Sequence, residues 1–215
     1  MRLGKSLLTV CVATACLAGC GDSKSEPEQG AASEQPATNV VQPGAPGEPS
    51  RKLPPGTKTE QLPHTEADVA FMQGMIHHHQ QAIVMTDWVP DRTESTSIRL
   101  LAKRMSISQT DEMKQMREWL TKRDFDPGDH SHAHKPMPGM VNSRQLAKLK
   151  AAKGADFDRL FLRYMTQHHN GALIMVDQLK ADGGGGETDI GVFTNHVYAD
   201  QSIEIGRMHE LLAKL

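Results

Sequence analysis

Histidine and methionine recur at fixed spacing in two separate parts of this 215-residue chain. Residues 71–89 read FMQGMIHHHQQAIVMTDWV, and residues 161–179 read FLRYMTQHHNGALIMVDQL. Each stretch contains adjacent histidines with a methionine before and after them. Imidazole nitrogen binds copper, zinc, iron or nickel, whereas thioether sulfur prefers soft ions such as Cu(I). A repeat that keeps both residue types in register therefore indicates metal binding.

Alignment of the two stretches leaves seven positions identical. The pairs are Phe71/Phe161, Met75/Met165, His78/His168, His79/His169, Ala82/Ala172, Met85/Met175 and Asp87/Asp177. A weaker likeness follows each stretch, between residues 101–120 and 193–212. It keeps Gln109/Gln201, Glu112/Glu204, Met116/Met208, Glu118/Glu210 and Leu120/Leu212. The unit is thus a His-His segment followed by a Gln-x-x-Glu-x-x-x-Met segment, and it is duplicated.

The position of the cysteines limits the chemistry of such a site. All three lie in residues 1–20, so the part of the chain that folds has neither thiolate nor disulfide. Histidine and methionine without thiolate favour copper over zinc, although other transition metals and both copper oxidation states stay open. The candidate ligands are Met75, His78, His79, Met85, Met165, His168, His169 and Met175. Glu112, Met116, Glu204 and Met208 are either further ligands or groups that orient the imidazoles.

A second group of histidines and methionines lies between the two repeats. It consists of His130, His132, His134, Met137 and Met140. On composition, His-x-His-x-His in a Pro/Gly-rich segment is typical of a metal-capturing tract. The alternative is a solvated polar loop that ends in a Met-Pro-Gly-Met turn.

The first residues of the chain have the features of a secretory signal. Arg2 and Lys5 precede a short apolar run, and Leu17-Ala18-Gly19-Cys20 resembles a bacterial lipoprotein cleavage box. We expect a signal peptide over residues 1–20, lipid on Cys20, and a location in the cell envelope facing the periplasm. An ordinary signal with a chance cysteine is the alternative. Residues 21–63 are rich in Pro, Gly, Ser, Glu and Gln, which predicts a disordered linker.

The rest of the chain, residues 64–215, has the periodicity of helices. Start and stop residues predict long helices at about 66–88, 94–122, 156–181 and 188–214, and a short one at about 143–152. The repeats then span about 66–123 and 156–215. No segment alternates with a period of two, so no sheet is expected.

The repeated residues occupy one seam of each predicted helix. Phe71, Met75, His78, Ala82 and Met85 are separated by four, three, four and three residues, which is the spacing of a face packed in a bundle. Two αα-hairpins joined by a longer connection predict an all-α, ferritin-like four-helix bundle. Adjacent histidines differ by about 100° around a helix. One of each pair can therefore face the centre of the bundle and the other a neighbouring helix.

The His-His helices, the Gln-x-x-Glu-x-x-x-Met helices and the Met-Pro-Gly-Met connection together resemble the bacterial domain-of-unknown-function family 305. These are secreted, ferritin-like four-helix bundles that include CopM-like copper-binding proteins. The resemblance covers about residues 66–215 and implies copper binding by the His and Met residues of the two repeats. This chain departs from the family at His77, where Pro is usual, and in the four glycines at residues 183–186.

These observations leave three functions to compare. The first is a membrane-tethered protein that binds copper for sequestration, tolerance or transfer. The second is a structural or interaction bundle in which His and Met only pack. The third is a di-metal oxidase, which we do not expect because the chain has no Glu-x-x-His and no His-Glu-x-x-His. The net charge of −2 and the lack of a basic stripe give no reason to expect a nucleic-acid partner.

Overall fold

The computed structural model describes residues 41–42, 49–54, 62–128 and 137–215. Cys20 and the predicted capture histidines His130, His132 and His134 lie outside these residues. The chain divides into two units, Met1–Lys58 and Thr59–Leu215.

The first unit contains one small pair of strands. β1 (Val41–Gln42) and β2 (Arg51–Lys52) are antiparallel, with Val41 opposite Lys52. This pair lies in the predicted linker, where no strand was expected. Each strand has only two residues, which is too short to produce the alternation on which a sequence-based prediction depends.

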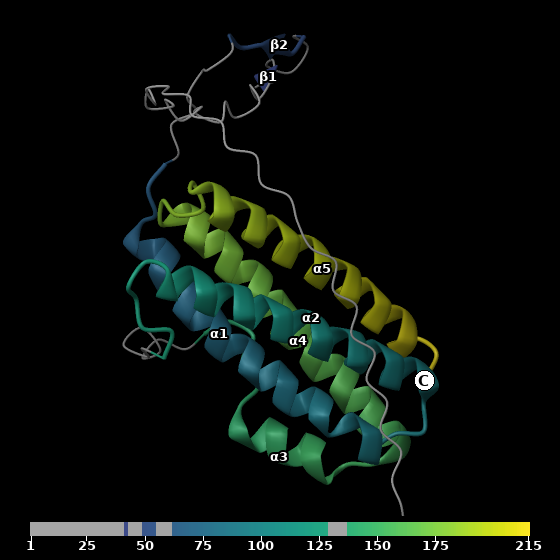
Figure 1. The fold of residues 1–215 in the computed structure, drawn as a ribbon. Coiled ribbons are helices and arrows are strands. Elements are labelled where there is room, and N and C mark those ends of the chain that lie inside the picture. Colours follow the sequence, from purple (N-terminus) through teal and green to yellow (C-terminus); the bar gives the residue numbers. More distant parts are fainter. Residues whose placement is uncertain (1–40, 43–48, 55–61, 129–136) are drawn as a thin grey trace, which may run out of the picture. The chain divides into compact units, whose positions relative to one another are not determined.

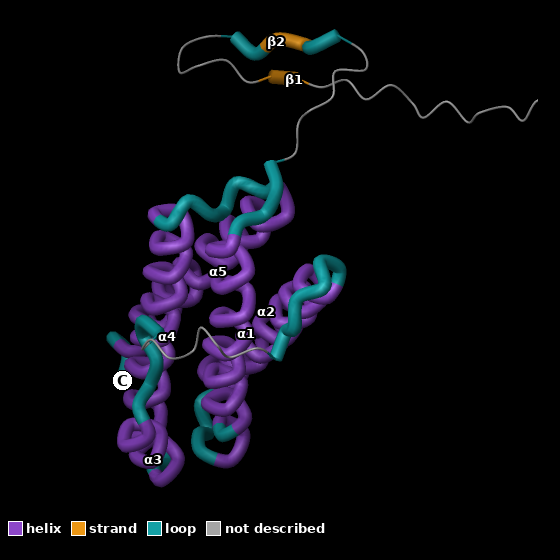
Figure 2. The backbone as a smooth tube through the Cα atoms, turned by 90° about the vertical axis from the view of Figure 1, so that its left-hand side faces the viewer, coloured by secondary structure: helices purple, strands orange, loops and turns teal. Residues whose placement is uncertain are grey.

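The second unit is the predicted four-helix bundle. The long helices are α1 (Glu66–Asp87), α2 (Thr96–Thr121), α4 (Gly154–Ala181) and α5 (Thr188–Leu212). A short 3₁₀ helix (Val89–Asp91) follows α1, and α3 (Ser143–Ala151) precedes α4 and packs beside it. Each predicted helix is therefore confirmed to within a few residues (Figures 1 and 2). Among the helices that the structure describes, none is both long and apolar enough to cross a membrane.

Local hydrogen bonds set the beginning of α1 and attach it to the end of α4. Thr65 and Asp68 form a capping box, in which each side chain accepts from the other residue's backbone N–H. Asp68 Oδ1 also accepts from the backbone N–H of Gly185, at 2.7 Å. Gly185 has a φ of 81°, a conformation that glycine adopts without strain. The glycine-rich turn therefore holds the start of α1 beside the end of α4.

Contacts at the other helix ends show that neighbouring helices of the bundle are antiparallel. The Gly154 N–H at the start of α4 donates to the carbonyl of Arg92, 2.7 Å away and just beyond α1. At the end of α2, Trp119 Nε1 donates to Glu187 Oε2 at 2.8 Å, and Arg123 forms an ion pair with the same carboxylate. Glu187 immediately precedes α5. These contacts bring the midpoints of α1 and α4 opposite each other.

The hydrophobic core consists of two apolar clusters. The first includes Phe71 and Met75, and the second includes their repeat equivalents Phe161 and Met165. The duplication therefore relates one cluster to the other by an approximate two-fold axis. In each long helix, buried polar residues lie between the residues that belong to the first cluster and those that belong to the second.

Candidate metal centre

A layer of buried polar side chains, here called the histidine layer, separates the two apolar clusters. Its members are His78, His79, Gln109, Glu112, His168, His169, Gln201 and Glu204. All four histidines have an exposed fraction of 0%, and the glutamates and glutamines are at most 8% exposed. Each of α1, α2, α4 and α5 contributes two members. Polar groups so deeply buried are stable only when they have partners or when they bind something.

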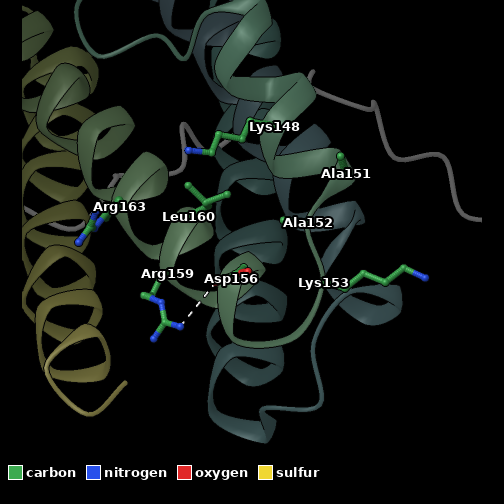
Figure 3. Close-up of a pocket in the computed structure, with 8 residues that line it drawn as sticks. All are labelled: Lys148, Ala151, Ala152, Lys153, Asp156, Arg159, Leu160 and Arg163. Atoms are coloured by element: carbon green, nitrogen blue, oxygen red, sulfur yellow. Dashed lines mark ion pairs between the residues drawn. The ribbon is translucent and has the colours of Figure 1, made fainter.

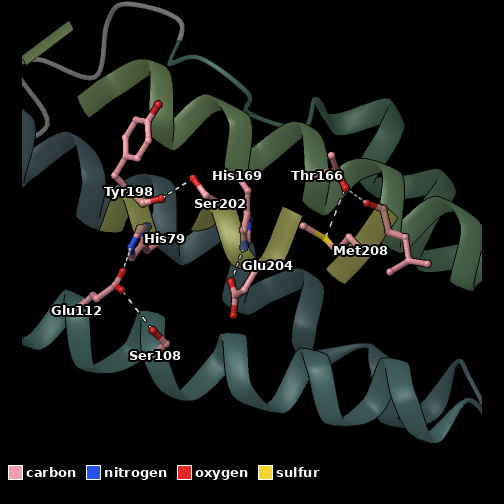
Figure 4. Close-up of polar contacts among 10 residues, drawn as sticks. His79, Ser108, Glu112, Thr166, His169, Tyr198, Ser202, Glu204 and Met208 are labelled. Carbon is pink, nitrogen blue, oxygen red and sulfur yellow. Dashed lines mark hydrogen bonds and ion pairs between the residues drawn. The ribbon is translucent and has the colours of Figure 1, made fainter. Parts of the chain in front are cut away.

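Two histidines of the layer are paired with glutamates. His79 Nε2 lies 2.6 Å from Glu112 Oε2, and His169 Nε2 lies 2.7 Å from Glu204 Oε2 (Figure 4). In both pairs the histidine is on the first helix of its hairpin and the glutamate on the second. The Ser108 hydroxyl donates to the other oxygen of Glu112 at 3.3 Å. The repeat thus places two equivalent His–Glu pairs in one core.

The other two histidines meet across the α1–α4 interface. The ring centroids of His78 and His168 are 3.8 Å apart, with 34° between the ring planes. His168 Nε2 donates to the backbone carbonyl of His78 at 2.9 Å, and His78 Nε2 donates to the carbonyl of Pro138 at 3.1 Å. As expected for adjacent residues on a helix, one histidine of each pair faces the centre and the other faces the next helix.

The hydrogen-bond partners determine which ring nitrogen carries the proton. Carbonyl and carboxylate oxygens only accept, so Nε2 is the protonated nitrogen in all four rings and Nδ1 can carry a free lone pair. Burial, with a smaller electrostatic contribution from neighbouring His79, lowers the pKa of His78 to about 3. Burial and His78 likewise lower the pKa of His168 well below its usual range. His78 and His168 are therefore neutral at neutral pH.

Most of the buried polar atoms without a partner in the described part of the chain belong to this layer. They include Nδ1 of all four histidines, both amide atoms of Gln109 and Oε1 of Gln201. A bare Nδ1 whose opposite N–H is held by a carboxylate is the arrangement that metal-binding histidines use. The layer therefore contains nitrogen atoms that have no hydrogen-bond partner and that are suited to bind a metal ion.

The predicted methionine ligands flank the histidine layer on both sides. Met75 precedes His79 by one helical turn, and Met116 follows Glu112 by one turn on the antiparallel partner helix. Both methionines belong to the first apolar cluster and are fully buried. Their equivalents Met165 and Met208, together with Met85, belong to the second cluster, and Met175 belongs to the first. Thioethers thus adjoin each His–Glu pair, and they also fill the core.

The two halves differ in the polar groups around these residues. The Thr166 hydroxyl lies 3.6 Å from Met208 Sδ (Figure 4), whereas the equivalent position in the first repeat is Ile76. Ser108, which donates to Glu112, is replaced by Asp200 in the second repeat.

The connection before α3 lies directly against the histidine layer. Gly139, with a φ of 74°, packs on Gly171 of α4 so closely that a Cβ on Gly171 would lie 2.1 Å from the Pro138 carbonyl oxygen. Gln81 donates to the Val141 carbonyl at 2.9 Å and accepts from its N–H at 2.7 Å. Gln167 donates to two further carbonyls of the same segment. We call residues 137–141 the strap.

Met137 of the strap packs against the core rather than extending into an open loop. It is half-buried beside the first apolar cluster, and its Sδ would lie 4.0 Å from a Cβ on Gly74. Met175 Cε would lie 3.7 Å from the same point. Met137, which was predicted to belong to the capture loop, therefore lies near Met175 in the structure. Met140 is also half-buried.

Other histidines of the bundle lie outside the histidine layer. His64 packs edge-on against Trp119 and Phe125, and His196 and His209 are exposed. Within residues 62–128 and 137–215, no three or more His, Asp or Glu side chains are grouped so that they could hold a metal ion. A site in this part of the bundle would therefore need methionine or a shift of side chains.

Sequence reasoning missed several residues of the site. Gln109 and Gln201 are kept in the repeat, so the signal that identified the histidines was also available for them. Gln81, Gln167 and the Pro138 carbonyl carry no such signal, because their role depends on where the strap crosses the bundle.

Solved structures similar to this chain include two DUF305 proteins and CopM. A DUF305 fragment from Deinococcus radiodurans is 29% identical, with a TM-score of 0.64 over 72% of this chain and 100% of that one. A DUF305 protein from Streptomyces coelicolor, described as a candidate secreted protein, is 28% identical, with a TM-score of 0.63 over 69% and 93%. CopM in its Cu(II)-bound form is 27% identical, with a TM-score of 0.55 over 68% and 97%. CopM structures with Cu(I) and with silver have the same fold.

Among curated sequences, the uncharacterized protein L153 of Acanthamoeba polyphaga mimivirus is 39% identical over 56 residues. This match covers 26% of the chain and only 37% of the viral protein. The model of the family described as a domain of unknown function, DUF305, matches residues 68–212, which is the bundle without the first two residues of α1. The resemblance seen in the sequence is confirmed, and the chain belongs to the DUF305 family.

Proposed function

We propose that this protein binds copper in the bundle, for storage or transfer rather than for catalysis. The observation that carries the proposal is the set of four fully buried imidazoles, each with an Nδ1 that has no hydrogen-bond partner in the described part of the chain. The similarity to CopM, which has been solved with Cu(I), Cu(II) and silver, supports copper over other metals.

In this proposal, some residues of the bundle bind the ion and others orient the residues that bind it. Nδ1 of His79 and of His169 would hold the ion in the two halves, and Glu112 and Glu204 hold the opposite nitrogen of each ring and fix its orientation. Met75, Met116, Met165 and Met208 would supply thioether sulfur, which selects for a soft ion. The low pKa of His78 and His168 keeps protons from competing for the central rings.

The proposal also includes a location of the protein in the cell envelope. The predicted lipoprotein signal would tether the bundle to a membrane of the cell envelope through Cys20, and the description of the Streptomyces coelicolor relative is consistent with export. His130, His132 and His134 would capture the ion next to the strap in sequence. The strap contacts His78 through the Pro138 carbonyl, which gives a route from capture to the layer.

Copper titration tests the proposal. The chain is titrated with Cu(I) and with Cu(II) against competing chelators, alongside a His79→Gln/His169→Gln variant and a matched control. His196→Gln/His209→Gln is that control, because it also removes two histidines but both are exposed. We expect the layer variant to lose about 100-fold in affinity and the control to change little.

Circular dichroism of all three proteins checks that each is folded. Weak binding that is the same in the layer variant and in the control would refute the proposal. It would then favour a bundle in which histidine and methionine only pack.

A further inference from the structure

A basic hollow lies between α3 and the first turns of α4, separate from the histidine layer. It has a volume of 660 Å³ (Figure 3). Its lining residues are Lys148, Ala151, Ala152, Lys153, Asp156, Arg159, Leu160 and Arg163. Four of these eight carry a positive charge and only one carries a negative charge.

The surrounding segment is unusually basic for this protein. Residues 143–163 contain six lysines and arginines and two aspartates, whereas the whole chain has a net charge of −2. One of the aspartates, Asp158, is buried in the bundle and does not line the hollow. Clustered like charges repel each other and raise the local potential, which attracts anions.

Two cations on the Arg163 side of the hollow, Lys148 and Arg163, are uncompensated, and so is Lys153. No carboxylate of the described residues lies within ion-pair distance of Lys148 or Arg163. Arg159 is 3.6 Å from Asp156, and it donates to the Leu215 carbonyl at 3.1 Å. The Asp156–Arg159 pair is well exposed, so it neutralises little of the charge.

The side chains are arranged around an apolar floor. Arg163 follows Leu160 by three residues and Arg159 by four, so its side chain lies beside both on the surface of α4. Figure 3 shows Lys148 extending from α3 above Leu160 toward Arg163, while Lys153 extends the opposite way. We call Lys148, Arg159, Leu160 and Arg163 the cradle.

We propose that the cradle binds an oxyanion of the phosphate class. Guanidinium groups present paired N–H donors that match phosphate oxygens, and the lysine adds a point charge. Leu160 and the two alanines can contact the carbon side of a phosphate ester. This chemistry is shared by free phosphate and by the phosphate of an anionic lipid headgroup, and the experiment below separates the two sources.

Paired variants test the cradle. The full chain is made with Cys20→Ser, so that no lipid on this residue contributes. Lys148→Gln/Arg163→Gln removes the two uncompensated cations of the cradle, and Lys103→Gln/Arg104→Gln removes one lysine and one arginine that are exposed on α2. Both variants therefore have the same charge, and circular dichroism checks that both are folded.

Binding is measured in two ways at constant ionic strength. Calorimetric titration with inorganic phosphate detects a site for the free anion. Cosedimentation with phosphatidylglycerol vesicles, compared with phosphatidylcholine vesicles, detects a site for a lipid headgroup. In at least one of the two assays, we expect the cradle variant to bind at least about tenfold more weakly than the Lys103/Arg104 control.

Each outcome decides the question. A selective loss in the phosphate titration identifies a free phosphate or phosphate ester as the ligand, and a selective loss in the vesicle assay alone identifies the headgroup. No binding in either assay overturns the proposal, and so does equal binding by the two variants. Neither result bears on copper binding, because the cradle and the histidine layer share no residue.

Discussion

Each histidine of the layer has one ring nitrogen with a hydrogen-bond acceptor and one without. A buried nitrogen without a partner costs about 1–3 kcal/mol of stability. A core of leucine and isoleucine would avoid this cost four times over. The layer therefore lowers the stability of the folded state. Unpaired polar groups that are kept in a core at such a cost are typical of a binding site.

The stability of the bundle should depend on pH through the central histidines. The unfolded chain protonates His78 below about pH 6.5, whereas the folded chain keeps it neutral until about pH 3. The unfolded state then binds more protons, so stability is fully present above the unfolded pKa and is lost as the pH falls. From about pH 7 to about pH 5 the loss due to His78 is about 2 kcal/mol, and His168 adds to it in the same direction.

Urea denaturation across this pH range measures the effect. A His78→Gln/His168→Gln variant should show a much smaller change in unfolding free energy between the two pH values. An equal change in the variant and in the parent chain would assign the pH dependence to other groups.

The glutamates should act by orienting the imidazoles. Glu112→Gln keeps the shape of the side chain but replaces the charged acceptor of the His79 N–H with a neutral one. We expect copper affinity to fall by about 10–100-fold and stability to fall by about 1 kcal/mol. Competition titration and urea denaturation measure the two effects. The control is Glu118→Gln on the same helix, where the side chain is 53% exposed. If both variants bind copper equally, Glu112 has no role in the site.

At the scale of elements, the strap connects the two hairpins and also closes one side of the histidine layer. Three side chains hold it through backbone groups: His78 on α1, Gln81 on α1 and Gln167 on α4. None of these bonds joins two side chains, so the hydrogen bonds depend little on the side chains of the strap. The close packing depends instead on the absence of a Cβ at Gly139 of the strap and at Gly171 of α4.

Gly171→Ala should therefore disturb the strap. The new Cβ would lie 2.1 Å from the Pro138 oxygen, so the strap must move, and we expect a loss of about 2–3 kcal/mol. Gly206→Ala is the matched control, because nothing lies within 4 Å of its Cβ and alanine favours a helix by about 1 kcal/mol. Thermal unfolding of both variants compares them. A Gly171 variant as stable as the parent chain would show that the close packing is not required.

At the scale of the whole molecule, the approximate two-fold axis passes between His78 and His168. It relates His79–Glu112 to His169–Glu204, and one apolar cluster to the other. Each half contains one His–Glu pair with methionines one turn away. The arrangement therefore predicts two equivalent binding positions rather than a single central one.

Single-half variants test this equivalence. His79→Gln and His169→Gln should each remove one copper equivalent, and the double variant should remove both. Stoichiometry from competition titration reports the result. If either single variant abolishes all binding, the two halves form one shared site instead.

The sequence was sufficient to predict the fold, and it singled out the histidines and glutamates that the structure buries in one layer. Helix starts such as Thr65 depend on residues three positions apart, and the seam depends on spacing within one helix. The same is true of the histidine pairs and their glutamates, because the duplication marked them. The partners of His78 and His168 could not be predicted, since both are backbone carbonyls whose positions depend on tertiary packing. The position of Met137 beside the core also depends on tertiary packing.

The axis between His78 and His168 lies within one chain, whereas in a homodimer of hairpins it would lie between two. In such a dimer, every substitution would appear in both halves at once. Fusion into one polypeptide allows each half to evolve separately. The differences between Ser108 and Asp200, and between Ile76 and Thr166, show that this divergence has begun next to the His–Glu pairs. Under the proposed function, two positions that arose as copies can thus acquire unequal affinities for the ion.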